Sequence, residues 1–386
     1  MRVLLTGAAG FIGSTVFDLL TARGDEVIPV DLLLPKAHGV VESHGLDRHG
    51  ADRHGVDRPD RPGRPRWSPD DLLVGDVRDP DFVRRVLRGV DVVCHQAAMV
   101  GLGVDAGDAP DYAGHNVLGT AVLLAGMAEA GVRRLVQASS MVVYGEGRYL
   151  CSVHADVRPG ARRPEALAAG SYEPPCPHCG RPLRWASINE DAALDPRNSY
   201  AASKVGQEQF AAAWAGQTSG SVTSLRYHNV YGPRMPRDTP YAGVAAIFRS
   251  ALESGRPPRV YEDGGQMRDF VHVHDIAAAN LAAIDRLAGA EPTSGGEVLA
   301  CNVSSGDPHT VGELAAELAT AMSGPPPLIV GGGRAGDVRH VVADPALAAE
   351  MLGFQARVRF ADGVKEFATA PMRAPAGSNV TPRSEA

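Results

Sequence analysis

The chain has 386 residues, which is longer than one small compact domain, so we expect two lobes. Its formal net charge of −7, without a basic stripe of interleaved aromatic side chains, argues against a nucleic-acid partner. No apolar stretch approaches membrane-spanning length, and five cysteines without a dense spacing pattern fit a reducing compartment. The sequence therefore predicts a soluble, cytoplasmic protein with neither a nucleic-acid nor a membrane partner.

The first segment combines a strand, a glycine-rich turn and a helix. An apolar run over 3–5 predicts the strand, and the amphipathic segment 14–23 predicts the helix. Between them the glycines repeat as G-x-x-G-x-x-G, which permits a tight turn and close approach of an anion. No lysine stands where a Walker A loop needs one, so a nucleoside triphosphate is the poorer ligand. A dinucleotide is expected to contact Gly7, Gly10, Phe11, Ile12 and Gly13.

The next strands end in residues that suit the rest of a dinucleotide. A strand over 26–31 ends on Asp31, about twenty residues beyond the glycine loop, where a carboxylate takes the hydroxyls of an adenosine ribose. A carboxylate there repels a 2′-phosphate, so the sequence predicts NAD rather than NADP. Strands over 72–77 and 90–98 place further cofactor contacts at their carboxyl ends, namely Asp76, Val77, Ala97 and Ala98.

Strands and helices alternate with short turns, which predicts an α/β fold with a Rossmann-type, doubly wound parallel sheet. A strand over 134–138 leads into Ser140, and a later helix carries Tyr200 and Lys204 on one face. The Lys204 ammonium is expected to lower the Tyr200 pKa from about 10 toward neutral pH. Beside an oxidised nicotinamide, which is also cationic, the phenol would then act as a general base.

Two insertions interrupt the pattern. Residues 36–70 hold three copies of a polar unit, His-Gly-x-Asp-Arg, which cannot bury a core and predicts a disordered surface segment. Residues 146–190 hold two ligand pairs with two residues between the members of each pair, which predicts a structural zinc site. The expected ligands are Cys151, His154, Cys176 and Cys179. His178 is an alternative to His154, and four unligated side chains in a loop are the alternative to a metal site.

Three motifs together resemble the extended short-chain dehydrogenase/reductase family. They are the glycine loop, Ser140 before Val143-Tyr144-Gly145, and Tyr200-x-x-x-Lys204. The likeness continues through 226–234 and 268–275 to about residue 344, and it points to the nucleotide-sugar epimerase/dehydratase branch. The cysteine-bearing insertion resembles one found in dTDP-L-rhamnose 4-epimerases.

The resemblance implies a role for each matched residue. Ser140 would hydrogen-bond the sugar oxygen that is oxidised, Tyr200 would take its proton, and Lys204 would hold the nicotinamide ribose. Tyr227 would touch the nicotinamide, and Asn116 would also contact the cofactor. The residues expected to bind the nucleotide-sugar substrate are Ser140, Asn229, Arg268, Cys301, Arg334 and Asp337. Cys301 stands where some 4-epimerases carry a bulky residue, so its small side chain would leave room for a larger sugar substituent.

The chain departs from part of the family at Met141 and Val142. Dehydratases carry an acid pair at these positions and uronate decarboxylases a glutamate, whereas neither side chain here transfers a proton. This favours an NAD-dependent nucleotide-sugar 4-epimerase that oxidises sugar C4 transiently, acting on dTDP-L-rhamnose or a related deoxysugar. The alternatives are a nucleotide-sugar 4-ketoreductase, decarboxylase or dehydratase of the same family, or a noncatalytic NAD sensor.

The expected organisation has two lobes. Residues 1–224 form the NAD-binding domain, and residues 225–370 form a smaller substrate-binding lobe from which 267–303 return to the first domain. Residues 371–386, rich in proline, serine and small side chains, predict a flexible tail. The family resemblance implies a homodimer.

Overall fold

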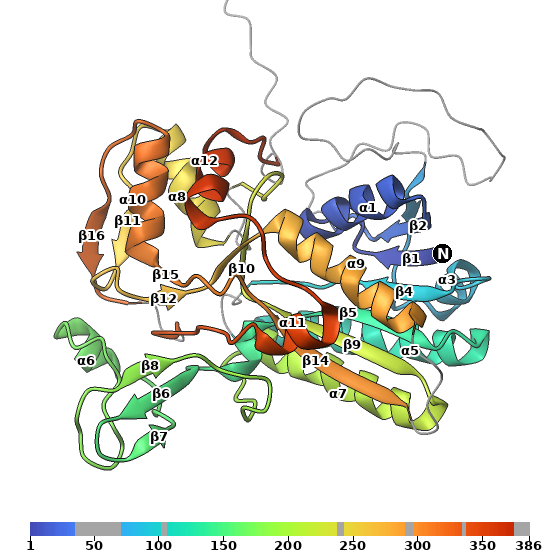
Figure 1. Cartoon of the computed structure of the whole chain (residues 1–386), viewed down its shortest axis with the longest axis horizontal. Helices are drawn as coiled ribbons and strands as arrows, with labels where there is room; N and C mark the ends of the chain where they lie inside the picture. The colour runs from blue at the N-terminus through green and yellow to red at the C-terminus, as the bar shows by residue number, and fades with distance from the viewer. Residues whose placement is uncertain (35–70, 102–105, 238–242, 290–295, 334–336, 374–386) are drawn as a thin grey trace, which may run out of the picture.

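The structure is a computed structural model of the chain, and it describes residues 1–34, 71–101, 106–237, 243–289, 296–333 and 337–373. Its centre is a seven-stranded sheet in the order β14-β9-β5-β4-β1-β2-β3, in which every neighbouring pair is parallel (Figure 1). This confirms the predicted Rossmann-type fold. The strands are β1 Arg2–Thr6, β2 Glu26–Asp31, β3 Leu73–Val74, β4 Val92–His95, β5 Arg134–Ser140, β9 Ser221–Tyr227 and β14 Glu297–Val303.

Helices cover both faces of this sheet. On one face lie α1 (Phe11–Arg23) and α9 (Val273–Gly289), and on the other lie α3 (Pro80–Val86), α5 (Gly119–Ala130) and α7 (Ser199–Thr218). Asn198 caps α7 because its side chain accepts a hydrogen bond from the backbone N–H of Ala201. Short helical turns complete this part of the chain: η2 Ala106–Asp108, α4 Ala109–Tyr112, η3 Ala113–Leu118, η4 Met141–Tyr144 and α11 Ala346–Leu352.

A second lobe packs beside the carboxyl edge of the sheet (Figure 1). Its core lies among α8 (Val244–Glu253), α10 (Val311–Ala321) and α12 (Phe360–Thr369). Three strand pairs accompany these helices: β10 Asn229–Tyr231 with β13 Phe270–His272, β11 Arg259–Tyr261 with β16 Leu328–Gly331, and β12 Met267–Arg268 with β15 His309–Thr310. No helix in the described ranges is both long and apolar enough to cross a membrane.

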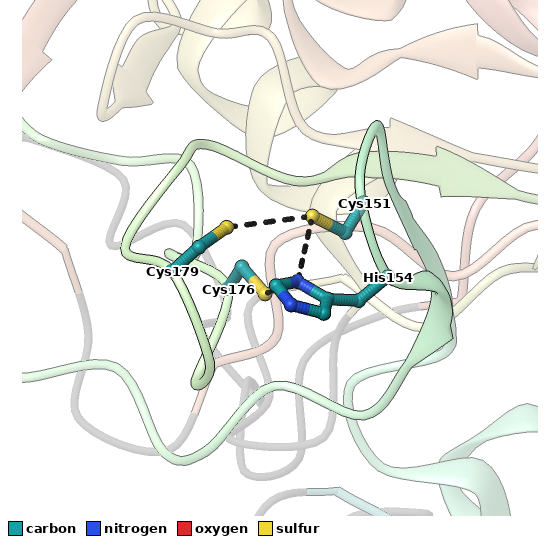
Figure 2. Close-up of side chains that lie close together, drawn as sticks. All are labelled: Cys151, His154, Cys176 and Cys179. Atoms are coloured by element: carbon teal, nitrogen blue, oxygen red, sulfur yellow. Dashed lines mark hydrogen bonds between the residues drawn. The ribbon is translucent and has the colours of Figure 1, made fainter.

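The insertion over 146–190 folds into a small unit of its own. An antiparallel sheet in the order β7-β6-β8 joins Arg148–Cys151, Ala155–Val157 and Arg184–Ala186, and a short helix, α6, covers Pro164–Ala168. Figure 2 shows side chains from two arms of this unit pointing toward one another: Cys151 and His154 from one arm, Cys176 and Cys179 from the other.

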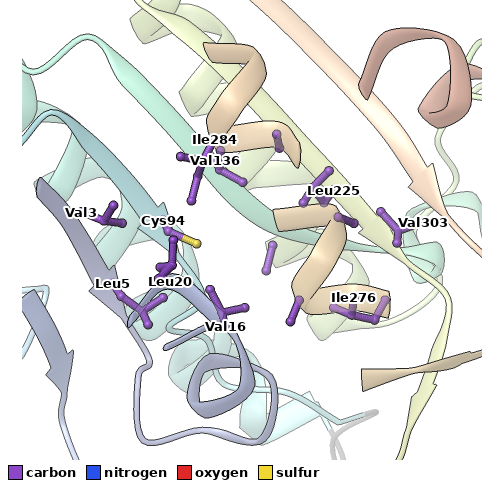
Figure 3. Packing of buried hydrophobic residues seen from close by; sticks show 14 of the residues in the cluster. Val3, Leu5, Val16, Leu20, Cys94, Val136, Leu225, Ile276, Ile284 and Val303 are labelled. Atoms are coloured by element: carbon purple, nitrogen blue, oxygen red, sulfur yellow. The ribbon is translucent and has the colours of Figure 1, made fainter. Parts of the chain in front are cut away.

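The main core lies between the sheet and the pair α1 and α9 (Figure 3). Successive residues of β1 face opposite sides, so Val3 and Leu5 pack against these helices while Leu4 packs against the helices of the other face. All three are fully buried, as expected for a parallel strand covered on both sides. Each such side chain contributes about 1.5–3 kcal/mol by leaving water.

Some predicted boundaries differ from the structure. The first helix begins at Phe11, three residues earlier than residue 14, and the third strand is shorter than predicted. The prediction of a flexible tail from residue 371 is wrong for its first residues, because the backbone of 371–373 pairs with 234–237. Residues 374–386 and the repeat-bearing insertion over 36–70 lie outside the described residues.

Candidate functional site

A cavity of about 380 Å³ opens at the carboxyl edge of the sheet, where ligands of doubly wound folds bind. Most of the predicted cofactor residues line it: Gly7, Gly10, Phe11, Ile12, Gly13, Asp31, Asp76, Val77, Ala97, Ala98, Tyr200, Lys204 and Tyr227. Asn116 is the exception, since it is fully buried and does not line the cavity. Its side chain instead bonds both backbone groups of Met99, so it supports the wall of the cavity.

The glycine loop leaves no room for larger residues. Gly7 has a φ of +70°, and a Cβ on it would lie 2.6 Å from the backbone nitrogen of Ala97. A Cβ on Gly13 would lie 2.0 Å from the Gly7 carbonyl oxygen. The turn therefore needs glycine at both positions, and it brings the first strand, the fourth strand and the start of α1 into contact. Such a turn offers backbone N–H groups and a helix N-terminus to an anion.

Asp31 is fixed at the rim of the cavity by backbone donors. Its Oδ2 accepts a hydrogen bond from the Ala9 N–H at 3.0 Å, and its Oδ1 accepts one from the Leu33 N–H at 2.9 Å. A carboxylate oxygen can accept more than one hydrogen bond. This geometry suits a ribose diol, and the negative charge disfavours a phosphate there.

Arg373 is a cavity residue that sequence reasoning missed. Its side chain reaches the glycine loop, where it donates to the carbonyls of Ala9 and Gly10 (2.8 Å for the latter) and to Ser14 Oγ at 2.8 Å. Burial and the neighbouring Arg234 lower the pKa of Arg373 to about 10, so the guanidinium stays charged at neutral pH. Its hydrogen bonds to the glycine loop and Ser14 go to neutral groups, and the Asp31 carboxylate lies near enough to act on its charge. A lone arginine in a polar C-terminal segment carries no sequence signal for this place.

Tyr200 and Lys204 line the cavity, and Ser140 hydrogen-bonds to Tyr200 without lining the cavity itself. Lys204 Nζ donates to the Ala138 carbonyl at 2.9 Å. Burial raises the pKa of Tyr200 to about 12, against a smaller opposing effect of its hydrogen bond with Ser140. The expected lowering of the Tyr200 pKa by Lys204 is therefore wrong, because the effect of burial on the Tyr200 pKa is larger. Burial also lowers the pKa of Lys204 to about 7, which weakens its effect as a cation.

The predicted substrate residues lie in different environments in the structure. Asn229 lies on β10 with a buried Oδ1 that has no hydrogen-bond partner among the described residues. Arg268 donates to the carbonyls of Val338 (2.7 Å) and Arg339 (2.9 Å). Cys301 is fully buried in the main core and does not line the cavity.

Two further substrate residues belong to one chain segment. Asp337 accepts a hydrogen bond from Arg162 through its backbone carbonyl at 2.6 Å, and it lies near enough to Arg268 to act on its charge. Arg334 lies outside the described residues. Substrate contacts of all these residues stay predictions.

The four predicted metal ligands come together. Their ligand atoms all lie within 4.8 Å of one another. The Sγ atoms of Cys151 and Cys179 are 3.7 Å apart, and His154 Nδ1 lies 3.6 Å from Cys151 Sγ and 3.5 Å from Cys176 Sγ (Figure 2). A tetrahedral zinc with bonds of about 2.3 Å to sulfur and about 2.0 Å to nitrogen has edges of about 3.5–3.8 Å. Of the two candidate histidines, it is His154 whose ring nitrogen lies in this group of side chains.

The cysteines also suit a cation chemically. The backbone N–H groups of Val153 and His154 lower the pKa of the Cys151 thiol to about 6, so it is a thiolate at neutral pH. Thiolates are the form that binds metal. No other group of three or more histidine, cysteine or acidic side chains with this proximity occurs in the part of the chain that the structure describes.

The cavity lies at the carboxyl edge of a doubly wound sheet and is lined by a glycine loop. These features define a dinucleotide site of the Rossmann type. The profile of the NAD dependent epimerase/dehydratase family matches residues 3–295, and the chain belongs to that family. The dTDP-L-rhamnose 4-epimerase of Burkholderia thailandensis is 29% identical over 95% of this chain and 94% of its own length. The UDP-glucose 4-epimerase of Mycolicibacterium smegmatis is 30% identical over 94% of this chain and 96% of its own length.

Solved structures agree with this membership. The UDP-glucose 4-epimerase of Thermotoga maritima with UDP-glucose superposes with a TM-score of 0.70 at 25% identity, over 95% of this chain and 97% of that chain. The UDP-glucose 4-epimerase of Thermus thermophilus in complex with NAD gives a TM-score of 0.66 at 28% identity, over 95% and 98%. The predicted family is thereby confirmed.

Proposed function

We propose that this protein is an NAD-dependent nucleotide-sugar 4-epimerase. The observation that carries the proposal is that Tyr200 and Lys204 line the cavity beside the glycine loop, while Ser140 hydrogen-bonds to Tyr200. Relatives that match nearly the whole chain are named 4-epimerases, which supports the same reaction class. When bound, NAD supplies a reversible hydride acceptor for sugar C4, so that the carbon is oxidised to a ketone and reduced again from its other face.

The protein's own residues move the proton and hold the oxygen. Tyr200 takes the proton of the sugar 4-hydroxyl during oxidation and returns it during reduction. Ser140, its hydrogen-bond partner, donates to the sugar oxygen as the carbonyl develops. With a pKa of about 12, the phenol is protonated at neutral pH, so a cation beside it is needed before it acts as a base. An oxidised nicotinamide ring is such a cation, which ties proton removal to the loaded state.

The residues after Ser140 favour epimerisation over elimination or decarboxylation. Met141 and Val142 lie in the turn η4, directly after the strand that delivers Ser140. Neither side chain donates or accepts a proton, whereas elimination across the sugar ring needs an acid and a base beside Tyr200. A noncatalytic sensor would need the glycine loop but not this set of three side chains.

Arg373 is proposed as part of the NAD site. Its charged guanidinium sits on the glycine loop, at the point where a dinucleotide pyrophosphate is held by backbone N–H groups. A planar guanidinium suits two adjacent phosphates. The pairing of 371–373 with 234–237 would then close the chain over the cofactor and slow its release.

The substrate is proposed to be a nucleotide-linked deoxysugar such as dTDP-L-rhamnose. The insertion resembles one in dTDP-L-rhamnose 4-epimerases, and one relative over nearly the whole chain carries that name. The lobe over 225–370 would hold the nucleoside diphosphate, and the unpartnered Oδ1 of Asn229 supports a ligand on that side. Remote binding of the diphosphate would let the keto ring turn without leaving the site.

A structural zinc ion is proposed in the insertion. The tetrahedral edge lengths among the four ligands and the acidic Cys151 thiol support it. A closed set of four protein ligands leaves no open position for catalysis, so the ion would stabilise the insertion. Elemental analysis of protein purified without chelators is expected to find about one zinc per chain, and less than about 0.2 would contradict the site.

A homodimer and a reducing, cytoplasmic location are the remaining parts of the proposal. The family resemblance supports the dimer, and the five cysteines, all free thiols here, suit a reducing compartment. Sedimentation equilibrium of the purified protein tests the dimer, and a monomer at micromolar concentration would contradict it.

Tyr200→Phe tests the proposed reaction. Removing the phenolic oxygen is expected to lower turnover on an active nucleotide sugar by at least about 10²-fold while bound NAD is retained. Tyr261→Phe, in strand β11, is the matched control and should turn over normally. Full activity of Tyr200→Phe would overturn the mechanism.

A further inference from the structure

Side chains of the insertion over 146–190 form hydrogen bonds and ion pairs with one short segment, residues 337–344. We call residues 146–190 the clasp and residues 337–344 the bridging segment. Tyr149 Oη accepts a hydrogen bond from the His340 N–H at 3.0 Å, and Glu146 Oε2 accepts one from the Arg339 N–H at 3.1 Å. The Glu173 carboxylate lies 2.8 Å from a guanidinium nitrogen of Arg339 and 3.0 Å from His340 Nε2. Three side chains of the clasp therefore meet at two successive residues of the bridging segment.

The same segment is bound by the second lobe from another side. The Arg339 guanidinium pairs with Glu262 and Asp263, each at 2.8 Å. Arg268 donates to the carbonyls of Val338 and Arg339, as described above. The bridging segment therefore lies between the clasp and the second lobe. Asp337 is its first residue, and Arg268 of the lobe hydrogen-bonds to its backbone. Arg268 and Asp337 are two of the residues that the family resemblance predicts to bind the nucleotide-sugar substrate.

The contacts with the bridging segment and the four proposed metal ligands come from the same two arms of the clasp. Tyr149 lies two residues before Cys151 on β6, and Glu173 lies three residues before Cys176 on the other arm. Figure 2 shows the ligands of both arms converging at one point. A metal ion there would fix the distance between the arms, and with it the distance between Tyr149 and Glu173.

Apolar packing alone provides little to hold the arms together. The buried core of the clasp consists of Tyr149, Cys151, Val157, Cys176 and Leu183, and two of these five are metal ligands. A unit of this size seldom folds stably without a metal or a disulfide. The cysteines are free thiols in this structure, so the ligand geometry favours a metal ion.

We propose that the metal ion at these four ligands fixes the clasp on the bridging segment and thereby sets the affinity for the nucleoside diphosphate half of the substrate. The proposal rests on the proposed nucleotide-sugar function. No clasp residue lines the NAD cavity, so metal loading acts on substrate binding and leaves NAD binding unchanged. Arg339 and His340 are positioning residues in this scheme, and so are Tyr149 and Glu173.

Glu173→Gln tests the contact without disturbing the metal ligands. The variant loses the charge that holds Arg339 and His340, and the affinity for dTDP and UDP, measured by calorimetry, is expected to fall about tenfold. Its zinc content and its NAD content should equal those of the wild type. Asp156→Asn is the matched control, because Asp156 pairs with Arg148 on the exposed side of the clasp. That variant should bind both diphosphates normally.

Cys179→Ser tests the metal itself, since Cys179 is the exposed ligand and its replacement disturbs the core least. The variant is expected to lose zinc, to bind dTDP and UDP at least about tenfold more weakly and to keep its NAD. In turnover assays the loss should fall on KM more than on kcat. Unchanged diphosphate affinity in metal-free Cys179→Ser and in Glu173→Gln would overturn the proposal.

Failure of the proposed function would give a different result. If the wild type binds neither dTDP nor UDP, the substrate class is wrong and the clasp has no such role. If the wild type binds a diphosphate and both variants bind it more weakly, the clasp is supported even where no sugar is epimerised.

Discussion

Gly13→Ala is expected to disrupt the glycine loop and release NAD. The new Cβ would lie 2.0 Å from the Gly7 carbonyl oxygen and 2.8 Å from its carbon, whereas ordinary contact begins at 3.4 Å. The start of α1 must therefore move away from the loop by about 1.4 Å, the difference between 3.4 and 2.0 Å. Overpacking of this kind costs about 1–3 kcal/mol in the free energy of unfolding.

The displacement also separates the N–H groups that would hold the pyrophosphate. Charge-assisted hydrogen bonds are worth about 1.5–3 kcal/mol each, so the loss of one or two weakens NAD binding by at least about tenfold. Calorimetric titration with NAD and the NAD content of the purified protein measure this, and thermal unfolding measures stability.

Gly216→Ala is the control for the glycine substitution. Gly216 lies on α7 with nothing within 4 Å of the position of a Cβ, so alanine should raise stability by up to about 1 kcal/mol and leave NAD binding unchanged. The steric reasoning is refuted if Gly13→Ala keeps wild-type NAD content and melts at the wild-type temperature.

Three other predictions concern the cavity and its supports. Arg373→Met is expected to weaken NAD binding about tenfold in calorimetry by removing the charge on the glycine loop, while the exposed Arg256→Met leaves it unchanged; equal affinities would exclude Arg373 from the site. Asp31→Asn is expected to lower the ratio of the dissociation constants for NADP and NAD, because the carboxylate that repels a 2′-phosphate is gone. An unchanged ratio would contradict that role of Asp31. Burial lowers the pKa of His95 to about 3, so the unfolded chain binds one more proton than the native protein between about pH 6.5 and pH 3, and stability falls as the pH is lowered through that window. His95→Gln should therefore lose about 2 kcal/mol less of its unfolding free energy between pH 7 and pH 5 than the wild type, and parallel curves from urea titrations would contradict this.

The sequence predicted the dinucleotide cavity well because its signals are local. Gly7, Gly13 and Asp31 act through the turn or the strand end on which they lie, so spacing alone predicts their place. The cysteine spacing likewise predicted that Cys151, Cys176 and Cys179 come together, but the sequence left open whether His154 or His178 joins them.

The features of the site that the sequence did not predict depend on contacts between residues far apart in the chain. Arg373 reaches the glycine loop only because 371–373 pair with 234–237, and no pattern in a polar terminus encodes that pairing. The pKa of Tyr200 depends on burial by residues from several elements, which outweighs the lysine four positions away. Arg268 is expected to bind phosphates, and its guanidinium also donates to the backbone carbonyls of 338 and 339, a contact that the sequence pattern did not predict.

Transfer of the hydrogen at C4 tests the central claim most directly. Protein that retains its own NAD is incubated with dTDP-L-rhamnose and with UDP-glucose, each deuterated at C4, and the products are analysed by mass spectrometry and NMR. The proposed reaction predicts a 4-epimer of one of these sugars that keeps its deuterium at C4 without added NAD. Loss of the deuterium to solvent, or its appearance at another carbon of the sugar, would contradict a 4-epimerase.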